Sequence, residues 1–200
     1  MIFYNLFLFI SIKEKSYLYY VFAIGSQLAF IFLDSKHLRY LLDEMYRDTW
    51  YVDMLERLVF PLMALTALLF QRSLLRIWEN NGKLDKALLS LSAAFGIVAI
   101  LTFVPNEKNF QYLFVFLVFI SIPLSFYTNV DAIRRGNVTA VVHMSAVSVF
   151  LSGVIISMLV QIWPSFPNNV STANAYIMAL IIQSLLLSLS LSFRYNQIKQ

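Results

Sequence analysis

Apolar residues occur in six long blocks that are separated by short polar connections. The blocks cover residues 17–33, 58–70, 87–104, 110–130, 138–163 and 173–193, and apolar flanks lengthen the second. An α-helix needs about 20 apolar residues to cross a hydrocarbon core of roughly 30 Å. The pattern therefore predicts an all-α fold, a polytopic helical membrane bundle with six full transmembrane helices.

A further apolar block, residues 1–12, is too short to cross a bilayer and ends at Lys13. It fits either a short interfacial anchor or the C-terminal half of a truncated first transmembrane helix. We favour the second interpretation. The whole chain, 1–200, is then one transmembrane domain, in which 1–12 is a partial first span and 194–200 begins a cytoplasmic signalling helix.

The composition supports the membrane assignment. Apolar residues make up 60% of the chain and charged residues 13%, whereas about a quarter of the residues in soluble domains are charged. Cysteine is absent, which excludes disulfides and thiolate metal sites. The membrane lipid is therefore an expected partner. Nucleic acid is not an expected partner, because the basic residues lie in the short loops between spans.

The charged residues are distributed unequally between the two ends of the predicted spans. Connections 13–16, 71–86 and 131–137, with the tail from Arg194, hold ten basic and four acidic residues, a net charge of +6. The opposite connections, 34–57, 105–109 and 164–172, hold five basic and seven acidic residues, a net charge of −2. Lysine and arginine bias places the first set, and the C-terminus, in the cytoplasm. Four arginines are predicted to anchor this face: Arg72, Arg134, Arg135 and Arg194.

No catalytic motif is present: the chain lacks H-E-x-x-H, a glycine-rich phosphate loop and G-x-S-x-G. The two histidines, His37 and His143, fall toward opposite membrane faces, so a shared haem or metal is not expected. We expect no enzyme activity, no cofactor and no metal. His143 lies within a span, where an ionisable group suggests pH sensing; helix packing is the alternative that we favour.

Small and polar residues form stripes on the last two predicted spans. Helices approach closely at small residues in membranes, and hydroxyls bond between helices. We therefore expect the two spans to dock through these stripes. The candidates for packing and transmission are Ser148, Ser152, Gly153 and Ser157 on the sixth span, and Gln183, Ser184, Ser188 and Ser192 on the last.

Several short segments resemble one family in order along nearly the whole chain. These are YNLFLF at 4–9, SYLYY at 16–20, RSL at 72–74, LD at 84–85, AIRRG at 132–136 and LLLSL at 185–189. The chain resembles the membrane region of bacterial seven-transmembrane receptors with diverse intracellular signalling modules. Gln183 stands where members of that family usually carry a glutamate.

The resemblance implies a sensor and transmitter module of a bacterial signal-transduction receptor in the inner membrane. It implies an extracellular sensory domain and a cytoplasmic output domain of kinase, cyclase or phosphatase type, both absent from this chain, and a homodimer. A stimulus would shift or rotate the last helix relative to its neighbours. The alternative function is a small-molecule transporter or a channel-like protein. Against it, the apolar centres of the six spans lack Asp, Glu, Lys and Arg.

Overall fold

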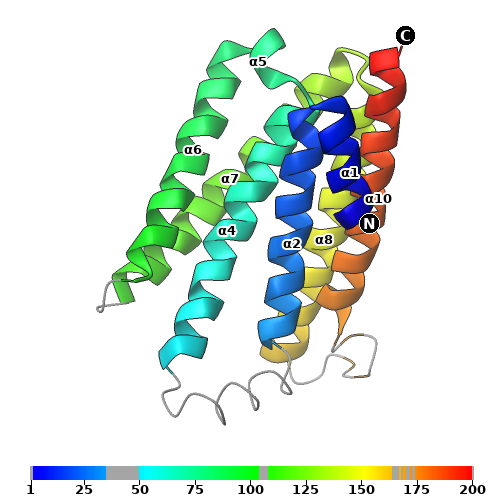
Figure 1. Ribbon diagram of the computed structural model, residues 1–200. Coiled ribbons are helices and arrows are strands. Elements are labelled where there is room, and N and C mark those ends of the chain that lie inside the picture. The colour runs from blue at the N-terminus through cyan, green and yellow to red at the C-terminus, as the bar shows by residue number, and fades with distance from the viewer. Residues whose placement is uncertain are drawn as a thin grey trace. The chain divides into compact units, whose positions relative to one another are not determined.

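The computed structural model describes residues 2–34, 50–103, 108–163, 167, 169, 172 and 174–199. Within these residues the regular elements are all α-helices, and six are long and apolar enough to cross a membrane. The predicted all-α polytopic bundle is confirmed. The helices are α1 (Ile2–Ile12), α2 (Lys15–Asp34), α4 (Trp50–Leu74), α5 (Ile77–Asn80), α6 (Gly82–Leu101), α7 (Lys108–Arg134), α8 (Val138–Ile162) and α10 (Ala175–Lys199) (Figure 1).

The helix ends follow local capping rather than the limits of the apolar blocks. Helix α6 begins at Gly82, five residues before its apolar block, because the Asn81 side chain accepts a hydrogen bond from Leu84 N at 3.2 Å. That bond satisfies one of the four N–H groups that a helix start leaves free. Helix α1 has 11 residues, fewer than a full span requires. Most of the connections 34–57 and 164–172 lies outside the described residues.

The chain divides into two compact units, Met1–Thr128 and Asn129–Gln200, called unit 1 and unit 2. In unit 1, α1 packs on α2, α2 on α4, and α4 on α6 (Figure 1). The part of α7 that belongs to this unit joins through aromatic contacts: the Phe114 ring lies 5.9 Å from Phe95 and 6.1 Å from Phe60. Buried aromatic rings, including Tyr20 and Phe70, therefore form much of the core of unit 1.

Unit 2 is built on α8 and α10, which pack against each other along their length (Figure 1). The last residues of α7 lead into α8 through a turn at Gly136, whose φ is +80°. Only glycine adopts this left-handed backbone without strain, so the turn requires it. Asn137 caps α8, and its side chain accepts a hydrogen bond from Thr139 N at 3.0 Å.

Each unit has one end that carries most of its basic residues, which we call its basic end. In unit 1 the basic end consists of the turn between α1 and α2 and the segment 71–86, which includes α5. In unit 2 it consists of the turn 131–137 and the C-terminal end of α10. The basic ends hold the connections for which the sequence predicts a cytoplasmic location.

Candidate functional site

The α8–α10 pair is the part of the chain in which the predicted packing residues meet. The buried residues of α8 are Thr139, Ala140, His143, Ala146 and Gly153, which recur at helical spacing. The buried face of α10 also follows this spacing, in which residues three and four positions apart share a face. Its members are Ala179, Leu180, Gln183, Leu187, Ser190, Leu191 and Arg194.

Gly153 is a point of close approach between the two helices. A Cβ atom added at Gly153 would lie 2.8 Å from Ala175 O and 3.3 Å from Tyr176 Cα, and it would overlap Ala179 Cβ. No larger residue fits without displacement of one helix. Close backbone approach at a small residue strengthens helix packing in a membrane, where lipid supplies no hydrophobic drive between helices.

Two hydrogen bonds join the helices on either side of this contact. Tyr176 N, in the first turn of α10, donates to Ser157 Oγ at 3.3 Å. Ser190 Oγ, about four turns further along, donates to Thr139 O at 3.3 Å. The first bond satisfies an N–H group that has no partner within its own helix. Together the bonds fix an antiparallel register over most of both helices.

The structure brings only some of the predicted stripe residues together. Gly153 and Ser157 contact the beginning of α10. Three of the other serines bond to carbonyl groups of their own helix: Ser152 Oγ donates to Ser148 O at 2.9 Å, Ser184 Oγ to Ile181 O at 2.7 Å and Ser192 Oγ to Ser188 O at 3.3 Å. Ser192 is exposed, whereas Gln183 is buried.

The register of the pair separates Ser152 from Ser188. The contact of Thr139 with Ser190 places Ser188 near residue 141 of α8. Ser152 lies 11 residues further along α8, which is roughly 16 Å at 1.5 Å per residue. The buried face of α10, which includes Gln183, Leu187 and Ser190, also differs from the face of the predicted serine stripe.

His143 is buried against the end of α7 within unit 2. Its Nδ1 lies 2.9 Å from Asn129 Oδ1, and the side chain is 3% exposed. An amide oxygen only accepts hydrogen bonds, so Nδ1 carries the proton in this contact. The buried imidazole thus links α7 to α8 within unit 2, and the packing and pH-sensing interpretations of this histidine both stay predictions.

The four predicted anchors occupy different environments. Arg72 forms a two-point ion pair with Asp85, and Arg135 pairs with Asp131 four residues earlier. Arg134 is exposed. Arg194 is only 6% exposed and lies on the buried face of α10. An anchor that reaches lipid headgroups would be exposed, so burial distinguishes Arg194 from the other three.

A polar cluster in unit 1 was not anticipated from the sequence. Gln71 Nε2 donates to Ser125 O at 2.9 Å and also bonds Thr128 Oγ1, while Ser125 Oγ donates to Gln71 Oε1 at 2.8 Å. Both groups of the Gln71 amide are thus used, and Gln71 is 2% exposed. The cluster ties α4 to α7 two residues after Pro123, which lies inside α7.

The fold and the site define the class of protein. Six apolar helices, close small-residue packing and hydrogen-bonded amides and hydroxyls characterise a multi-pass helical membrane protein. Among the described residues, no group of His, Asp and Glu side chains has the arrangement of a metal site.

The family assignment follows from the comparison with known families. The family described as "7TM diverse intracellular signalling" matches residues 1–194, and the chain belongs to it. The resemblance of the sequence to these receptors is thus confirmed, and the chain is a membrane sensor domain of the signalling-receptor type. No curated protein and no solved structure matches the chain.

Proposed function

We propose that this chain is the transmembrane sensor and transmitter of a bacterial receptor. It relays an extracellular or membrane stimulus to a cytoplasmic output domain of kinase, cyclase or phosphatase type. Membership of the 7TM diverse intracellular signalling family is the observation that carries the proposal. The proposal gives the chain no reaction of its own, and it includes a homodimer, because such outputs commonly work as dimers.

In the proposed relay, α10 is the element that carries the signal. It is one continuous helix from Ala175 to Lys199, and its apolar part extends to Asn196. Because Gly153 and Ser157 lock its first turns against α8, we propose that α10 and α8 move together. A stimulus then biases the pair between two arrangements, each read by the output domain.

We further propose that the basic ends lie in the cytoplasm of a bacterial inner membrane. The absence of cysteine makes labelling straightforward, since each introduced cysteine is the only thiol. We expect an impermeant maleimide to label Lys108→Cys in intact spheroplasts and to label Asn80→Cys only in inverted vesicles. The reverse pattern would contradict the orientation.

The relay is tested with helix insertions at the junction with an output module that follows Gln200, either natural or fused. Two inserted helical residues rotate the output by about 200°, whereas seven rotate it by about −20°. We expect stimulus-dependent output to survive the seven-residue insertion. The two-residue insertion and a flexible glycine-serine insertion should both abolish it.

Equal output from all three insertions would contradict helix transmission. Solute flux into proteoliposomes that required the chain, without coupling to any output, would favour the transporter alternative instead. The two results are separate, because flux needs no output module and the insertions leave the spans unchanged.

A further inference from the structure

A tryptophan is held at the surface of unit 1 by the ion pair of its basic end. Trp78 in α5 is 42% exposed, although the preceding Ile77 is 1% exposed. The Arg72 guanidinium lies 5.3 Å from the centre of the Trp78 ring. Arg72 is itself fixed by Asp85 through Nε–Oδ1 and Nη2–Oδ2 contacts of 2.5 and 3.0 Å. The position of the indole is therefore set by α4 and α6 together.

The charges at this end divide into paired and unpaired groups. Segments 13–15 and 72–86 hold six basic and three acidic residues, a net charge of +3. The two arginines are paired, Arg72 with Asp85 and Arg76 with Glu79 at 3.5 Å. In the described part of the chain, no ion pair is formed by the four lysines, all of them exposed: Lys13, Lys15, Lys83 and Lys86.

Helix stability does not account for where these lysines lie. Lys83 is in the first turn of α6 and Lys15 is the first residue of α2. The helix macrodipole favours acidic side chains at these positions and disfavours cations. Lys15 and Lys83 thus oppose the local helix electrostatics, and an anionic partner outside the chain would offset this cost.

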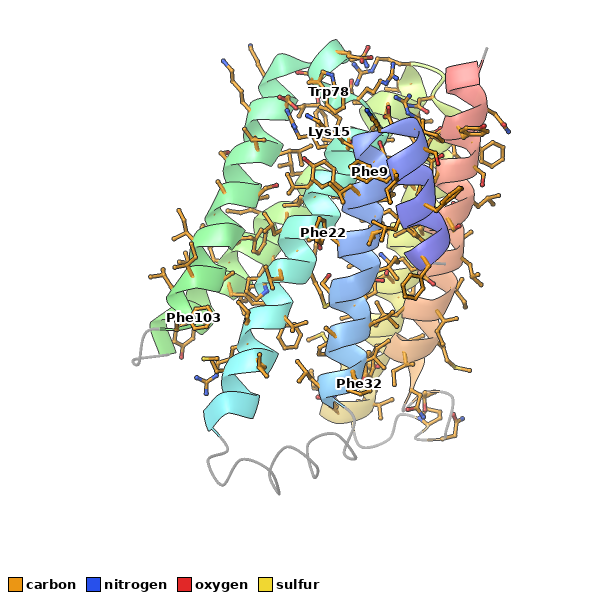
Figure 2. All side chains as sticks on the ribbon, in the orientation of Figure 1. Phe9, Lys15, Phe22, Phe32, Trp78 and Phe103 are labelled. Carbon is orange, nitrogen blue, oxygen red and sulfur yellow. The ribbon has the colours of Figure 1, made fainter. Side chains whose placement is uncertain are left out.

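We propose that the Trp78–lysine surface, formed by Trp78, Lys13, Lys15, Lys83 and Lys86, binds the headgroups of anionic phospholipids. Tryptophan prefers the headgroup level of a bilayer, and lysine stems lie along apolar surface while their ammonium groups reach water. Figure 2 shows Lys15 and Trp78 at the same end of unit 1, with Phe32 and Phe103 at the opposite end. The proposal depends on membrane insertion alone and not on the proposed relay.

The test measures which lipid lies next to Trp78. Replacing the other two tryptophans, Trp50→Phe and Trp163→Phe, leaves Trp78 as the only indole. The protein is reconstituted in phosphatidylcholine that contains a small fraction of either brominated phosphatidylglycerol or brominated phosphatidylcholine. We expect the anionic quencher to lower Trp78 fluorescence more strongly, and about 0.5 M NaCl to reduce that preference by screening.

The lysine variants then assign the preference to this surface. Each lysine near an anionic surface strengthens attraction roughly fivefold, so Lys83→Gln with Lys86→Gln should lower the preference by about 25-fold. The matched control compares two single substitutions that remove the same charge. Lys83→Gln, in the proposed surface, should lower the preference for the anionic lipid. Lys108→Gln, at the other end of the unit, should leave that preference unchanged. Unchanged far-UV circular dichroism checks that the variants fold.

Three results would overturn the proposal. Equal quenching by the two brominated lipids shows that no anionic lipid is preferred. An equal loss in Lys108→Gln and Lys83→Gln shows that the preference comes from net charge and not from this surface. Displacement of brominated phosphatidylglycerol by inorganic phosphate shows that the surface holds a small soluble anion rather than a lipid headgroup.

Discussion

The contact between α8 and α10 predicts a large effect from the smallest side-chain addition. Gly153→Ala places a methyl group where Ala175 O is 2.8 Å away and where Ala179 Cβ already lies. Neither atom belongs to the far end of a flexible side chain, so the clash is relieved only by separating the helices. We expect this substitution to destabilise the protein.

The magnitude follows from two opposing terms. Overpacking costs about 1–3 kcal/mol, and overlap with a Cβ and a backbone oxygen places this site near the upper value. Alanine is also a better helix former than glycine by about 1 kcal/mol, which offsets part of the cost. The expected net loss for Gly153→Ala is therefore about 2 kcal/mol.

Gly96→Ala is the matched control, because a Cβ added there meets nothing within 4 Å. It keeps the gain in helix propensity and has no overpacking cost, so it should stabilise the protein by up to about 1 kcal/mol. The difference between the two substitutions, about 3 kcal/mol, then isolates the cost of overpacking. Stability is measured by SDS titration from mild detergent, followed by far-UV circular dichroism.

A second substitution tests the mechanism of the loss. Ala179→Gly in the Gly153→Ala background removes the overlapping Cβ and should restore part of the lost stability. The reasoning is refuted if Gly153→Ala is as stable as Gly96→Ala. It is also refuted if Ala179→Gly lowers the stability of the Gly153→Ala protein by as much as it lowers that of the parent.

Three further predictions concern buried and paired polar groups. Gln71→Leu should lower the free energy of unfolding by about 1–3 kcal/mol, because it leaves buried hydroxyl and carbonyl groups of α7 without this partner; Gln161→Leu, at an exposed position, should change it by less than about 0.5 kcal/mol. Asp85→Asn should shift the fluorescence emission of Trp78 in the single-tryptophan protein, because it frees Arg72 from its carboxylate, while costing at most about 1 kcal/mol. His143→Gln should leave the pH dependence of the receptor output between about pH 5 and 8 the same as in the parent protein.

Each of these predictions has a result that contradicts it. Equal stability of the Gln71→Leu and Gln161→Leu proteins would show that the α4–α7 cluster does not stabilise the fold. Unchanged Trp78 emission in Asp85→Asn would show that the Arg72–Asp85 ion pair does not set the environment of the indole. Loss of a pH response in His143→Gln would support the sensing role over the packing role.

The transmembrane helices could be predicted because a bilayer imposes a single requirement, a long uncharged apolar block. Their ends depend on finer chemistry. The start of α6 is set by the Asn81 side chain, and the turn before α8 is set by the positive φ of Gly136. Asn81 and Gly136 are both visible in the sequence, but only the turn at Gly136 could be predicted from the residue type alone.

The face of α10 that contacts α8 shows where sequence reasoning selected the weaker signal. The stripe of Ser184, Ser188 and Ser192 is regular, but a serine can satisfy its hydroxyl on its own helix, as Ser184 and Ser192 do. Gln183 and Arg194 are 11 residues apart, close to three turns, and lipid exposure would cost them far more. That pair marks the face that also holds Ser190, the residue that bonds to α8.

The Gln71 cluster could not be predicted from the sequence for a different reason. Gln71 and Ser125 are 54 residues apart, and neither residue alone differs from other polar residues in the predicted helices. Their contact depends on the relative rotation of α4 and α7, which no periodicity specifies. Pro123 does not mark the contact either, because the carbonyl that it leaves without a helical partner is that of Phe119 and not that of Ser125.

The two kinds of contact within unit 2 also bear on the proposed relay. At one end of the α8–α10 pair the contact is steric, since Gly153 has no room for an added Cβ. At the basic end it is a hydrogen bond between Ser190 and Thr139, accompanied by the bond between His143 and Asn129. Ser190, Thr139 and His143 are buried, so these bonds can be exchanged only if other partners replace them, whereas a close-packed contact cannot be loosened without losing it. In the proposed relay the Gly153 contact therefore keeps α8 and α10 together as they move, and any rearrangement within the pair is confined to the hydrogen bonds at its basic end.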